Sequence, residues 1–258
     1  MVPFTLKCLG TGDGWPDARR GHSAYLYQLR KTCLLIDAGD PVERAYTASG
    51  LGPDLVDAIV LSHMHSDHVG GLFMLLQAFW LKNRRKPLPI YLPQGAIAPL
   101  RQMLNTVFFF DELLPFRLEL HPIQDELDLG GLRVSASRNS HLDGLRARFG
   151  NQHAADFSCY SFLLESGRKR VVHSADLGKP EDLEPLMRKP VDLLVCEMAH
   201  FEPEELLTFL HGRKIKQAAF IHLSAENRRR LGTIRRRAAR ELAGVPHRFV
   251  TDSEEVRF

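Results

Sequence analysis

Cysteine is scarce in this sequence, and neither sign of charge dominates it. The four cysteines, Cys8, Cys33, Cys159 and Cys196, form no Cys-x-x-Cys pair. Each lies in or beside an apolar stretch, where a free cysteine behaves as a small hydrophobic residue, so we expect buried thiols rather than disulfides or metal ligands. This usage fits a reducing, cytoplasmic setting. Lysine and arginine number 34 against 31 acidic residues, and the net charge of +3 does not by itself indicate a nucleic-acid partner.

Long apolar segments are missing as well. The longest, residues 70–81, contains a glutamine and runs into a lysine. It is too short to cross a bilayer, so no membrane partner is expected. The first residues lack a basic region followed by an apolar run, and we therefore expect no signal peptide. No low-complexity linker or repeat divides the chain, which favours a single domain over residues 1–258.

Short apolar runs with β-branched residues alternate with longer helical patterns, which predicts an α/β protein. The expected strands are 5–9, 24–29, 33–37, 58–61, 89–92, 116–122, 132–137, 159–165, 170–174, 193–197, 218–222 and 248–250. The expected helices are 41–49, 70–84, 95–104, 181–187, 203–210 and 225–243. Two facing sheets with helices outside are the simplest packing of two strand-rich halves.

Residues that commonly bind metals gather at the ends of predicted strands. One strand-to-helix loop, between the strand at 58–61 and the helix that opens at Gly70-Gly71, carries His63, His65, Asp67 and His68. A rigid scaffold presents the side chains of such a loop outward. Three more candidates, His141, Asp176 and His222, also lie at or just after strand ends. A single histidine would be taken as a solvated loop residue, but imidazole and carboxylate groups at this density suit Zn²⁺, with Mn²⁺ or Fe as alternatives.

These motifs resemble those of the metallo-β-lactamase superfamily, and the resemblance covers nearly the whole chain. The spaced elements are Leu34-Leu35-Ile36-Asp37-Ala38-Gly39, Ser62-His63-Met64-His65-Ser66-Asp67-His68-Val69-Gly70-Gly71, Asn139-Ser140-His141, His173-Ser174-Ala175-Asp176 and Phe220-Ile221-His222-Leu223-Ser224. The resemblance implies a four-layer αββα sandwich with the metals at one edge, in agreement with the packing of two sheets and outer helices.

The resemblance also implies a set of metal ligands, residue by residue. One metal would be held by His63, His65 and His141, and a second by Asp67, His68 and His222, with Asp176 bridging the two. Asp37 matches a carboxylate that steadies a ligand or its loop. The alternative for Asp37 is a turn-forming aspartate before Ala-Gly.

Two further segments point to a branch of the superfamily. Leu9-Gly10-Thr11-Gly12-Asp13-Gly14 and residues 220–224 resemble the ribonuclease Z and phosphodiesterase branch. True β-lactamases generally have cysteine where this chain has Asp176, so antibiotic hydrolysis is not expected. The chain departs from ribonuclease Z in lacking a glycine-proline-rich arm and a His-Ser-Thr motif between Asp176 and His222. Processing of tRNA 3′ ends is therefore not implied.

The function implied is that of a hydrolase in which two divalent metal ions, Zn²⁺ or else Mn²⁺ or Fe, use a bridging hydroxide to cleave an ester-type bond. A phosphodiester, in RNA or in a small or cyclic molecule, suits this chemistry best. Asp67 could orient the nucleophile, and His200, positioned by Glu197, could supply a proton to the leaving group. The alternative is that Glu197 and His200 are loop residues bonded locally. Hydrolysis of a thioester or lactone is the second function considered, and a non-catalytic binding or effector protein that retains the fold is the third.

Two basic segments could meet an anionic partner such as RNA. Residues 139–156 adjoin His141 and carry Arg146 and Arg148, as a loop at the site mouth or as a plain exposed connection. Residues 226–240 form an amphipathic helix whose arginines ring its polar faces. A solvated face is the default for this helix, and contact of Arg228 or Arg229 with a phosphate beside the scissile bond is the alternative. Since relatives in the family are often dimers, a homodimer is a further expectation.

Overall fold

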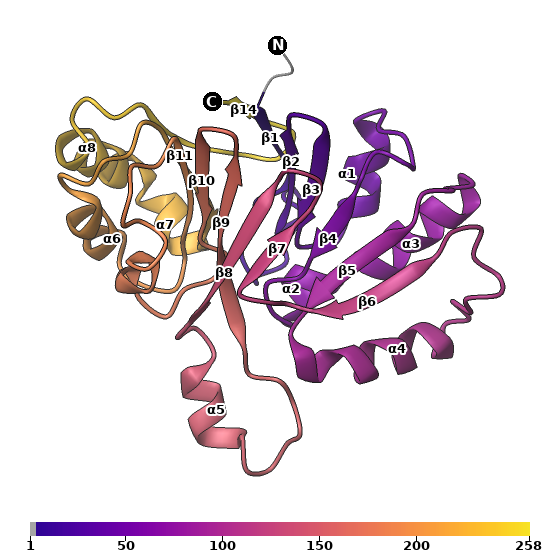
Figure 1. The fold of residues 1–258 in the computed structure, drawn as a ribbon. Helices are drawn as coiled ribbons and strands as arrows, with labels where there is room; N and C mark the ends of the chain where they lie inside the picture. Colours follow the sequence, from indigo (N-terminus) through magenta and orange to yellow (C-terminus); the bar gives the residue numbers. More distant parts are fainter. Residues whose placement is uncertain (1–3) are drawn as a thin grey trace.

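The fold was analysed in a computed structural model that describes residues 4–258. Two seven-stranded sheets face each other, and helices cover the outer side of each (Figure 1). This is the αββα sandwich that the resemblance predicts.

The first sheet is built mainly from the N-terminal half of the chain. Its strand order is β14-β1-β2-β3-β4-β5-β6. The strands are β1 (Phe4–Gly10), β2 (Ala24–Leu29), β3 (Thr32–Ile36), β4 (Ala58–Val60), β5 (Leu88–Leu92), β6 (Leu118–Pro122) and β14 (Glu255–Arg257). The helices of this half are α1 (Val42–Ala48), α2 (Ser66–Val69), α3 (Leu72–Leu81), the short 3₁₀ helix η1 (Gln94–Ala96) and α4 (Ile97–Thr106).

The second sheet has the order β13-β12-β11-β10-β9-β8-β7. Its strands are β7 (Glu126–Asp128), β8 (Arg133–Asn139), β9 (Cys159–Ser166), β10 (Lys169–His173), β11 (Leu193–Met198), β12 (Ala218–Leu223) and β13 (His247–Phe249). The helices of this half are α5 (Asp143–Phe149), the 3₁₀ helix η2 (Pro180–Leu183), α6 (Pro203–Leu210), α7 (Ala225–Arg229) and α8 (Leu231–Glu241).

Alternating side chains on the central strands divide the core into three layers. On β3, Leu34 and Ile36 point between the two sheets, whereas Leu35 packs under the helices of the first half. On β11, Leu193 faces the space between the sheets and Leu194 faces the helices of the second half. Strands buried on both faces read as continuous apolar runs, which is why both segments were recognisable in the sequence.

Most of the predicted elements are present, and the differences have physical reasons. The helix expected at 225–243 is divided at Arg230 into α7 and α8, and the one expected at 181–187 is only the 3₁₀ turn η2. The loop expected at 139–156 contains α5, which has no buried residue and therefore no apolar stripe to reveal it. The edge strands β7 and β14, of three residues each, were not predicted.

Two predictions about the whole chain can be compared with the structure. All four cysteines are buried and free, as expected. Among residues 4–258, no helix combines the length and the apolar character needed to cross a membrane. The single domain over residues 1–258 stays a prediction.

Candidate metal centre

The loop after β4 is shaped by close backbone packing. Ala38 N donates to His68 O at 2.7 Å, and Gly71 N donates to Ala38 O at 2.9 Å. A Cβ atom at Gly39 would lie 2.1 Å from Asp67 O, so only glycine fits where the Asp-Ala-Gly segment passes the loop. This explains why the two glycine-containing motifs occur together: they hold the strand-to-helix loop against the end of β3.

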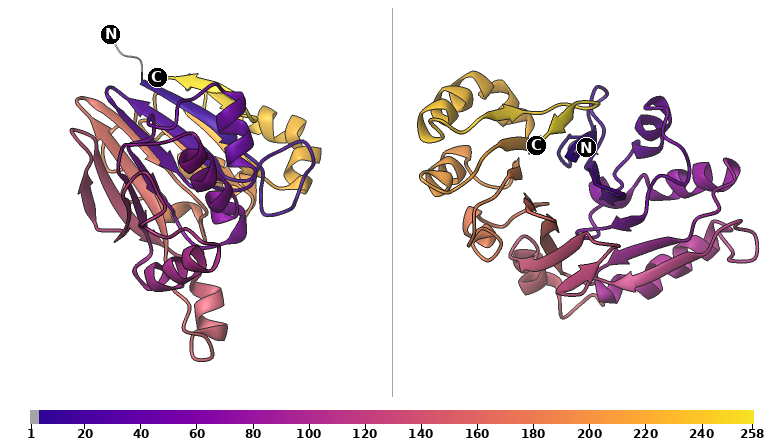
Figure 2. Two further views of the ribbon diagram at one scale, coloured as in Figure 1. Left: turned by 90° about the vertical axis from the view of Figure 1, so that its right-hand side faces the viewer. Right: turned by 45° about the horizontal axis from the view of Figure 1, so that its top comes forward.

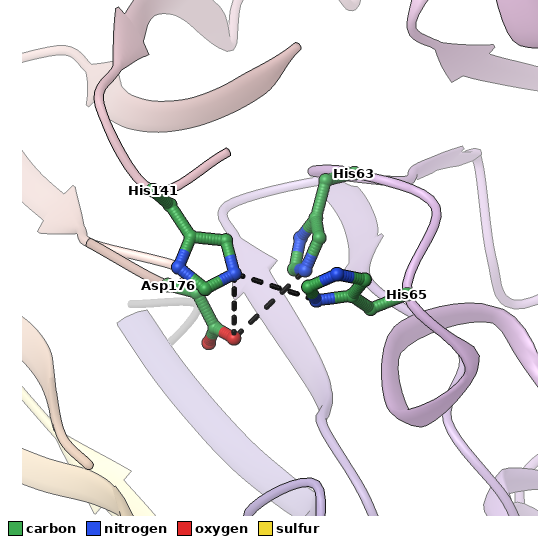
Figure 3. Close-up of side chains that lie close together, drawn as sticks. All are labelled: His63, His65, His141 and Asp176. Carbon is green, nitrogen blue, oxygen red and sulfur yellow. Dashed lines mark hydrogen bonds and ion pairs between the residues drawn. The ribbon is translucent and has the colours of Figure 1, made fainter. Parts of the chain in front are cut away.

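The predicted ligands meet at one edge of the sandwich in two groups that share Asp176. In each group the ligand atoms all lie within 4.8 Å of one another. We call His63, His65, His141 and Asp176 the outer cluster, and Asp67, His68, Asp176 and His222 the deep cluster. Figure 3 shows the outer cluster, with three imidazole rings turned toward the carboxylate of Asp176. The structure therefore brings together all seven residues that the resemblance implied.

The two oxygens of Asp176 face different clusters. Its Oδ2 atom lies 3.8 Å from His63 Nε2 and 3.7 Å from His141 Nε2. Its Oδ1 atom lies 3.3 Å from His68 Nε2 and 3.4 Å from His222 Nε2. One carboxylate thus stands between two groups of imidazole nitrogens, which is the placement that a bridging ligand requires.

The buried nitrogen atoms test whether metal ions fit these clusters. The Nε2 atoms of His63, His68 and His222 are buried and have no hydrogen-bond partner among the described residues. A buried polar atom without a partner costs about 1–3 kcal/mol, and proteins seldom leave three such atoms together. A cation at each cluster would satisfy them. The donor set of imidazole and carboxylate groups fits a pair of metal ions.

The electrostatics of the clusters also favour bound positive charge. Burial lowers the pKa of His141 to about 4, so its imidazole is neutral and its lone pair is free at neutral pH. Burial acts to raise the pKa of Asp67, but the hydrogen bond and the charge of His68 outweigh it and lower that pKa to about 2. His222 and His68 likewise outweigh burial and hold the pKa of Asp176 well below its ordinary value. Both carboxylates are therefore ionised inside a buried site.

Residues around the deep cluster fix the orientation of its rings. His68 Nδ1 lies 2.7 Å from Asp37 Oδ2, and Ser62 N donates to Asp37 Oδ1 at 2.7 Å. His222 Nδ1 is hydrogen bonded to Ser23 Oγ at 3.0 Å. A metal ligand held through its second ring nitrogen presents the first nitrogen in a fixed direction. Asp37 occupies the supporting place that the resemblance implied, whereas Ser23 had no signal in the sequence.

Glu197 and His200 lie beside the outer cluster. Glu197 is fully buried; its Oε1 atom accepts from Leu177 N at 2.8 Å and lies 3.0 Å from His200 Nδ1. The other ring nitrogen, His200 Nε2, lies 3.7 Å from Asp176 Oδ2. Burial acts to lower the pKa of His200, but its hydrogen bond to Glu197 and the charge of that residue raise it to about 9. Glu197 and His200 are hydrogen bonded to each other, as one interpretation of the sequence expected, and His200 also reaches the site, as the other interpretation requires.

Asn139 supports the metal centre, although the sequence indicated it only as part of the Asn-Ser-His motif. Its side-chain nitrogen donates to Asp176 O at 2.9 Å and to Ser161 Oγ at 3.0 Å. It thereby ties the segment that carries His141 to the segment that carries Asp176. Its place two residues before His141 in the Asn-Ser-His motif was the available signal.

Several basic residues near the site form ion pairs with carboxylates. Arg228 contacts Leu223 O, and its guanidinium lies 3.3 Å from Asp13 Oδ1 and 3.4 Å from Asp17 Oδ2. It therefore braces the loop between β1 and β2. A cavity of about 720 Å³ opens beside it, lined by Asp17, Arg19, Arg20, Ala225, Arg228, Arg229, Thr251 and Asp252. On α8, Arg237 pairs with Glu241 at 2.9 Å, as expected for a solvated helix face.

The segment after His141 projects from the body of the protein. Figure 1 shows α5 extending away from both sheets at the end of β8. The first view of Figure 2, turned by 90°, shows the same projection. Arg148 lies over the Phe149 ring at 4.8 Å from its centroid. The segment predicted as an exposed connection thus contains a short helix, which projects from the body of the protein next to the outer cluster.

Comparison with known proteins identifies the family. A family model described as a beta-lactamase superfamily domain matches residues 32–233 of the chain. The chain therefore belongs to the beta-lactamase superfamily. The matched range contains every residue of the deep and outer clusters.

Among curated proteins, the sequence is similar to ribonuclease Z. The ribonuclease Z of Thermococcus onnurineus (strain NA1) is 36% identical over 159 residues, which cover 62% of this chain and 42% of that protein. The ribonuclease Z of Mycolicibacterium gilvum (strain PYR-GCK) is 36% identical over 124 residues, which cover 47% of this chain and 42% of that protein. The matched segments span less than half of these relatives. The predicted resemblance to the ribonuclease Z branch is confirmed.

Solved structures share the fold at low sequence identity. YhfI from Bacillus subtilis, a metallo-beta-lactamase fold protein, aligns with a TM-score of 0.77 and 19% identity over the whole of both chains. The short form of human tRNase Z aligns with a TM-score of 0.71 and 18% identity over 98% of each chain. These similarities show that the αββα arrangement, including its two facing sheets, is that of the superfamily.

Proposed function

We propose that this protein is a metal-dependent hydrolase that cleaves phosphodiester bonds. The observation that carries the proposal is the carboxylate of Asp176, whose two oxygens face two separate groups of imidazole nitrogens. Divalent cations held in this way supply positive charge to a phosphoryl group and acidify water that contacts them. The similarity to proteins named ribonuclease Z supports the same bond class.

Zinc is the ion that we propose for both clusters. Five of the seven candidate ligands are histidines, and imidazole-rich sites with a few carboxylates suit Zn²⁺. His63, His65 and His141 would hold one ion, and Asp67, His68 and His222 the other, with Asp176 between them. Metal analysis of protein purified without added metal decides between zinc, manganese and iron.

The residues around the clusters would handle protons. Asp67 is an ionised carboxylate at the edge of the deep cluster, so it can accept a hydrogen bond from an attacking water and orient it. His200 presents its Nε2 atom toward the site while Glu197 holds the opposite nitrogen. We propose that His200 delivers a proton to the leaving oxygen and that Glu197 positions its ring.

RNA is the substrate class that we favour among phosphodiesters. The arginine-lined cavity adjoins the loop that carries Asp17, and Arg229 lines it without an ion pair to a carboxylate among the described residues. Such a cavity can receive a phosphate that flanks the scissile one. The absence of a tRNA-gripping arm separates this proposal from tRNA processing. A homodimer and a cytoplasmic setting stay predictions.

The proposed function is tested first through the metal ligands. We expect Asp176→Ala to lower both the bound metal and the hydrolysis of bis-p-nitrophenyl phosphate by at least about 100-fold, and His65→Ala to lower the hydrolysis as much while losing about one of the two ions, beyond the range typical of residues that only support ligands. Asp128→Ala, at an exposed position on β7, is the matched control and leaves both unchanged. Unchanged metal content and activity in the two ligand variants would refute the assignment.

The role of His200 is tested by changing the leaving group. p-Nitrophenolate leaves without a proton, whereas the ribose alkoxide of RNA needs one. We therefore expect His200→Ala to slow cleavage of a dinucleotide by about 100-fold or more and to affect bis-p-nitrophenyl phosphate only slightly. Glu197→Gln should follow the same pattern with a smaller loss. Equal losses on both substrates would indicate a structural role instead.

The arginine cavity is tested by the salt dependence of RNA binding. We expect Arg229→Ala to weaken binding of a single-stranded oligouridylate and to reduce the slope of log affinity against log salt by about 0.7, the value for one phosphate contact. Arg236→Ala on α8 is the matched control. A flat salt response in the unmodified protein would remove RNA as the favoured substrate.

Hydrolysis of thioesters or lactones is the competing function of the same fold. The two clusters would serve that chemistry equally well, but such substrates carry no flanking phosphate for the arginine cavity. Kinetic comparison of the metal-loaded protein on a thioester, a lactone and model phosphodiesters decides between them. A higher kcat/KM on the thioester or lactone would overturn the phosphodiester proposal.

A further inference from the structure

Trp15 is an exposed tryptophan on the loop between β1 and β2. Its side chain is 71% exposed, although tryptophan is among the most buried residue types on average. No part of the proposed function accounts for it. An exposed indole offers a large aromatic face that a ligand can cover.

The loop places Trp15 next to the deep cluster. A Cβ atom at Gly14, the preceding residue, would lie 3.4 Å from Asp67 Oδ2. Consecutive Cα atoms are ~3.8 Å apart, so the Cα atom of Trp15 lies about that far from the Cα atom of Gly14, which packs against Asp67. Gly14 packs against the carboxylate while its neighbour carries the ring into solvent.

The exposed ring is not the result of a loose loop. Thr11 Oγ1 donates to Asp252 Oδ1 at 2.7 Å, and Gly21 N donates to Asp252 Oδ2 at 2.6 Å. His22 Nδ1 lies 2.8 Å from Asp13 O, which closes the loop across its base. These bonds, together with the ion pairs of Arg228, hold the loop backbone on both sides of Trp15.

The surroundings of Trp15 indicate the chemistry of its ligand. Arg19 and Arg20, a few residues further along the same loop, line the arginine cavity together with Arg229. An aromatic ring and cations carried by one loop can bind the base and the phosphate of a nucleotide, since every base offers a π-face and every phosphate a charge. A purely apolar partner would leave these arginines unpaired.

We propose that the indole of Trp15 stacks on the nucleobase next to the scissile phosphodiester. The inference rests on the proposed function and narrows its substrate class to phosphodiesters that carry a base. Trp15 is then a specificity-determining residue: it contacts the substrate but takes no part in bond cleavage.

The kinetic test uses substrates that differ only in the base. Thymidine 5′-(p-nitrophenyl phosphate), its 3′ isomer and ethyl p-nitrophenyl phosphate share one leaving group, but only the first two carry a base. We expect Trp15→Ala to lower kcat/KM for at least one thymidine ester by ~10-fold, through KM, and to leave the ethyl ester unchanged. Trp15→Phe should retain most of the activity because it keeps an aromatic face.

A second test measures binding without turnover. Trp15 and Trp80 are the two tryptophans of the chain, so the fluorescence of Trp80→Phe reports Trp15 alone. We expect oligothymidylate to quench this emission in metal-free protein. In Trp15→Phe, where Trp80 is the remaining tryptophan, we expect no quenching. Phe108→Ala, at another exposed aromatic residue, is the matched control and changes neither measurement.

The outcomes separate this inference from the proposed function. If the unmodified protein hydrolyses none of the three esters, the proposed function fails, while quenching by oligothymidylate still tests Trp15. If it hydrolyses them and Trp15→Ala lowers kcat/KM equally for the ethyl and thymidine esters, or lowers neither, the stacking inference is overturned. Absence of quenching in Trp80→Phe would overturn it as well.

Discussion

The deep and outer clusters share one carboxylate but differ in how their histidines are held. In the deep cluster, His68 is fixed by Asp37 and His222 by Ser23, each through the ring nitrogen that faces away from Asp176. All members of the deep cluster are buried, whereas His65 and His141 of the outer cluster are only partly buried. The centre thus consists of a rigid half inside the protein and a more open half at its surface.

The outer histidines have weaker support. His63 Nδ1 is hydrogen bonded to Ser62 Oγ at 3.0 Å, but His65 and His141 are joined mainly to each other, through nitrogens 3.4 Å apart. A preorganised ligand set binds metal more tightly than one that must be ordered on binding. We infer that the deep cluster would hold a metal ion more tightly than the outer cluster.

The largest expected effect is a difference between His68→Ala and His65→Ala. Removing a deep ligand should empty both sites, because the outer cluster then loses the ion that helps to fix Asp176. Removing His65 should leave about one ion per chain while activity falls by more than about 100-fold. Metal analysis after dialysis against metal-free buffer measures both. His247→Ala, on β13 opposite Ala218 at the start of β12 and outside both clusters, is the control.

Retention of one ion by His68→Ala together with loss of both by His65→Ala would reverse the ranking of the clusters. The two variants must first show circular dichroism spectra like that of the unmodified protein. His68 is buried against Asp37, so its removal takes away the imidazole partner of that carboxylate and leaves it with Ser62 alone. The circular dichroism spectra therefore accompany the metal analysis, as a check that each variant is folded.

An intermediate effect is expected for Asp37→Asn. The amide keeps the shape of the side chain but removes the charge that orients His68, so affinity of the tighter site should fall by about 10–100-fold. Competition with a chelator measures this affinity. Asp57→Asn is a matched control, because Asp57 also supports backbone in the first sheet, through Cys33 N at 2.6 Å, but lies outside both clusters. Loss from the weaker site alone would contradict the assignment of Asp37 to the deep cluster.

The smallest effect is expected for Ser23→Ala. A neutral hydrogen bond contributes about 1 kcal/mol, so loss of the hydroxyl beside His222 should weaken the tighter site by about fivefold. The same chelator competition detects it. If Ser23→Ala were as severe as Asp37→Asn, the charge of Asp37 would not be what distinguishes the deep cluster.

The ligands were predictable from the sequence because they follow strand ends in compact motifs. His63 and His65 lie in the loop after β4, Asp67 and His68 lie on the short helix α2 that follows it, and His141, Asp176 and His222 each lie at or just after a predicted strand. The support from Ser23 was not predictable, since it depends on a contact between residues 199 positions apart. Asp37 was named because of the resemblance, not because its spacing to His68 reveals a contact.

The parts of the fold that escaped prediction are those with little apolar patterning. Helix α5 buries no residue, and the strands β7 and β14 have three residues each. The break at Arg230 lies within a run of arginines, where hydrophobic spacing gives no sign of a helix end. Trp15 was visible in the sequence, but its exposure and the contact of the preceding Gly14 with Asp67 follow only from the packing of the loop.

The hydrogen bonds of Asp252 determine when the first loop can reach its final structure during synthesis. Asp252 joins Thr11 and Gly21 across 241 and 231 positions of the chain, and β14 pairs with β1. During synthesis the first loop therefore leaves the ribosome long before the residue that fixes it. The wall of the metal centre that carries Gly14 and Trp15 takes its final form only after Asp252 and β14 have been synthesised, so the centre matures later than the segments that supply most of its ligands.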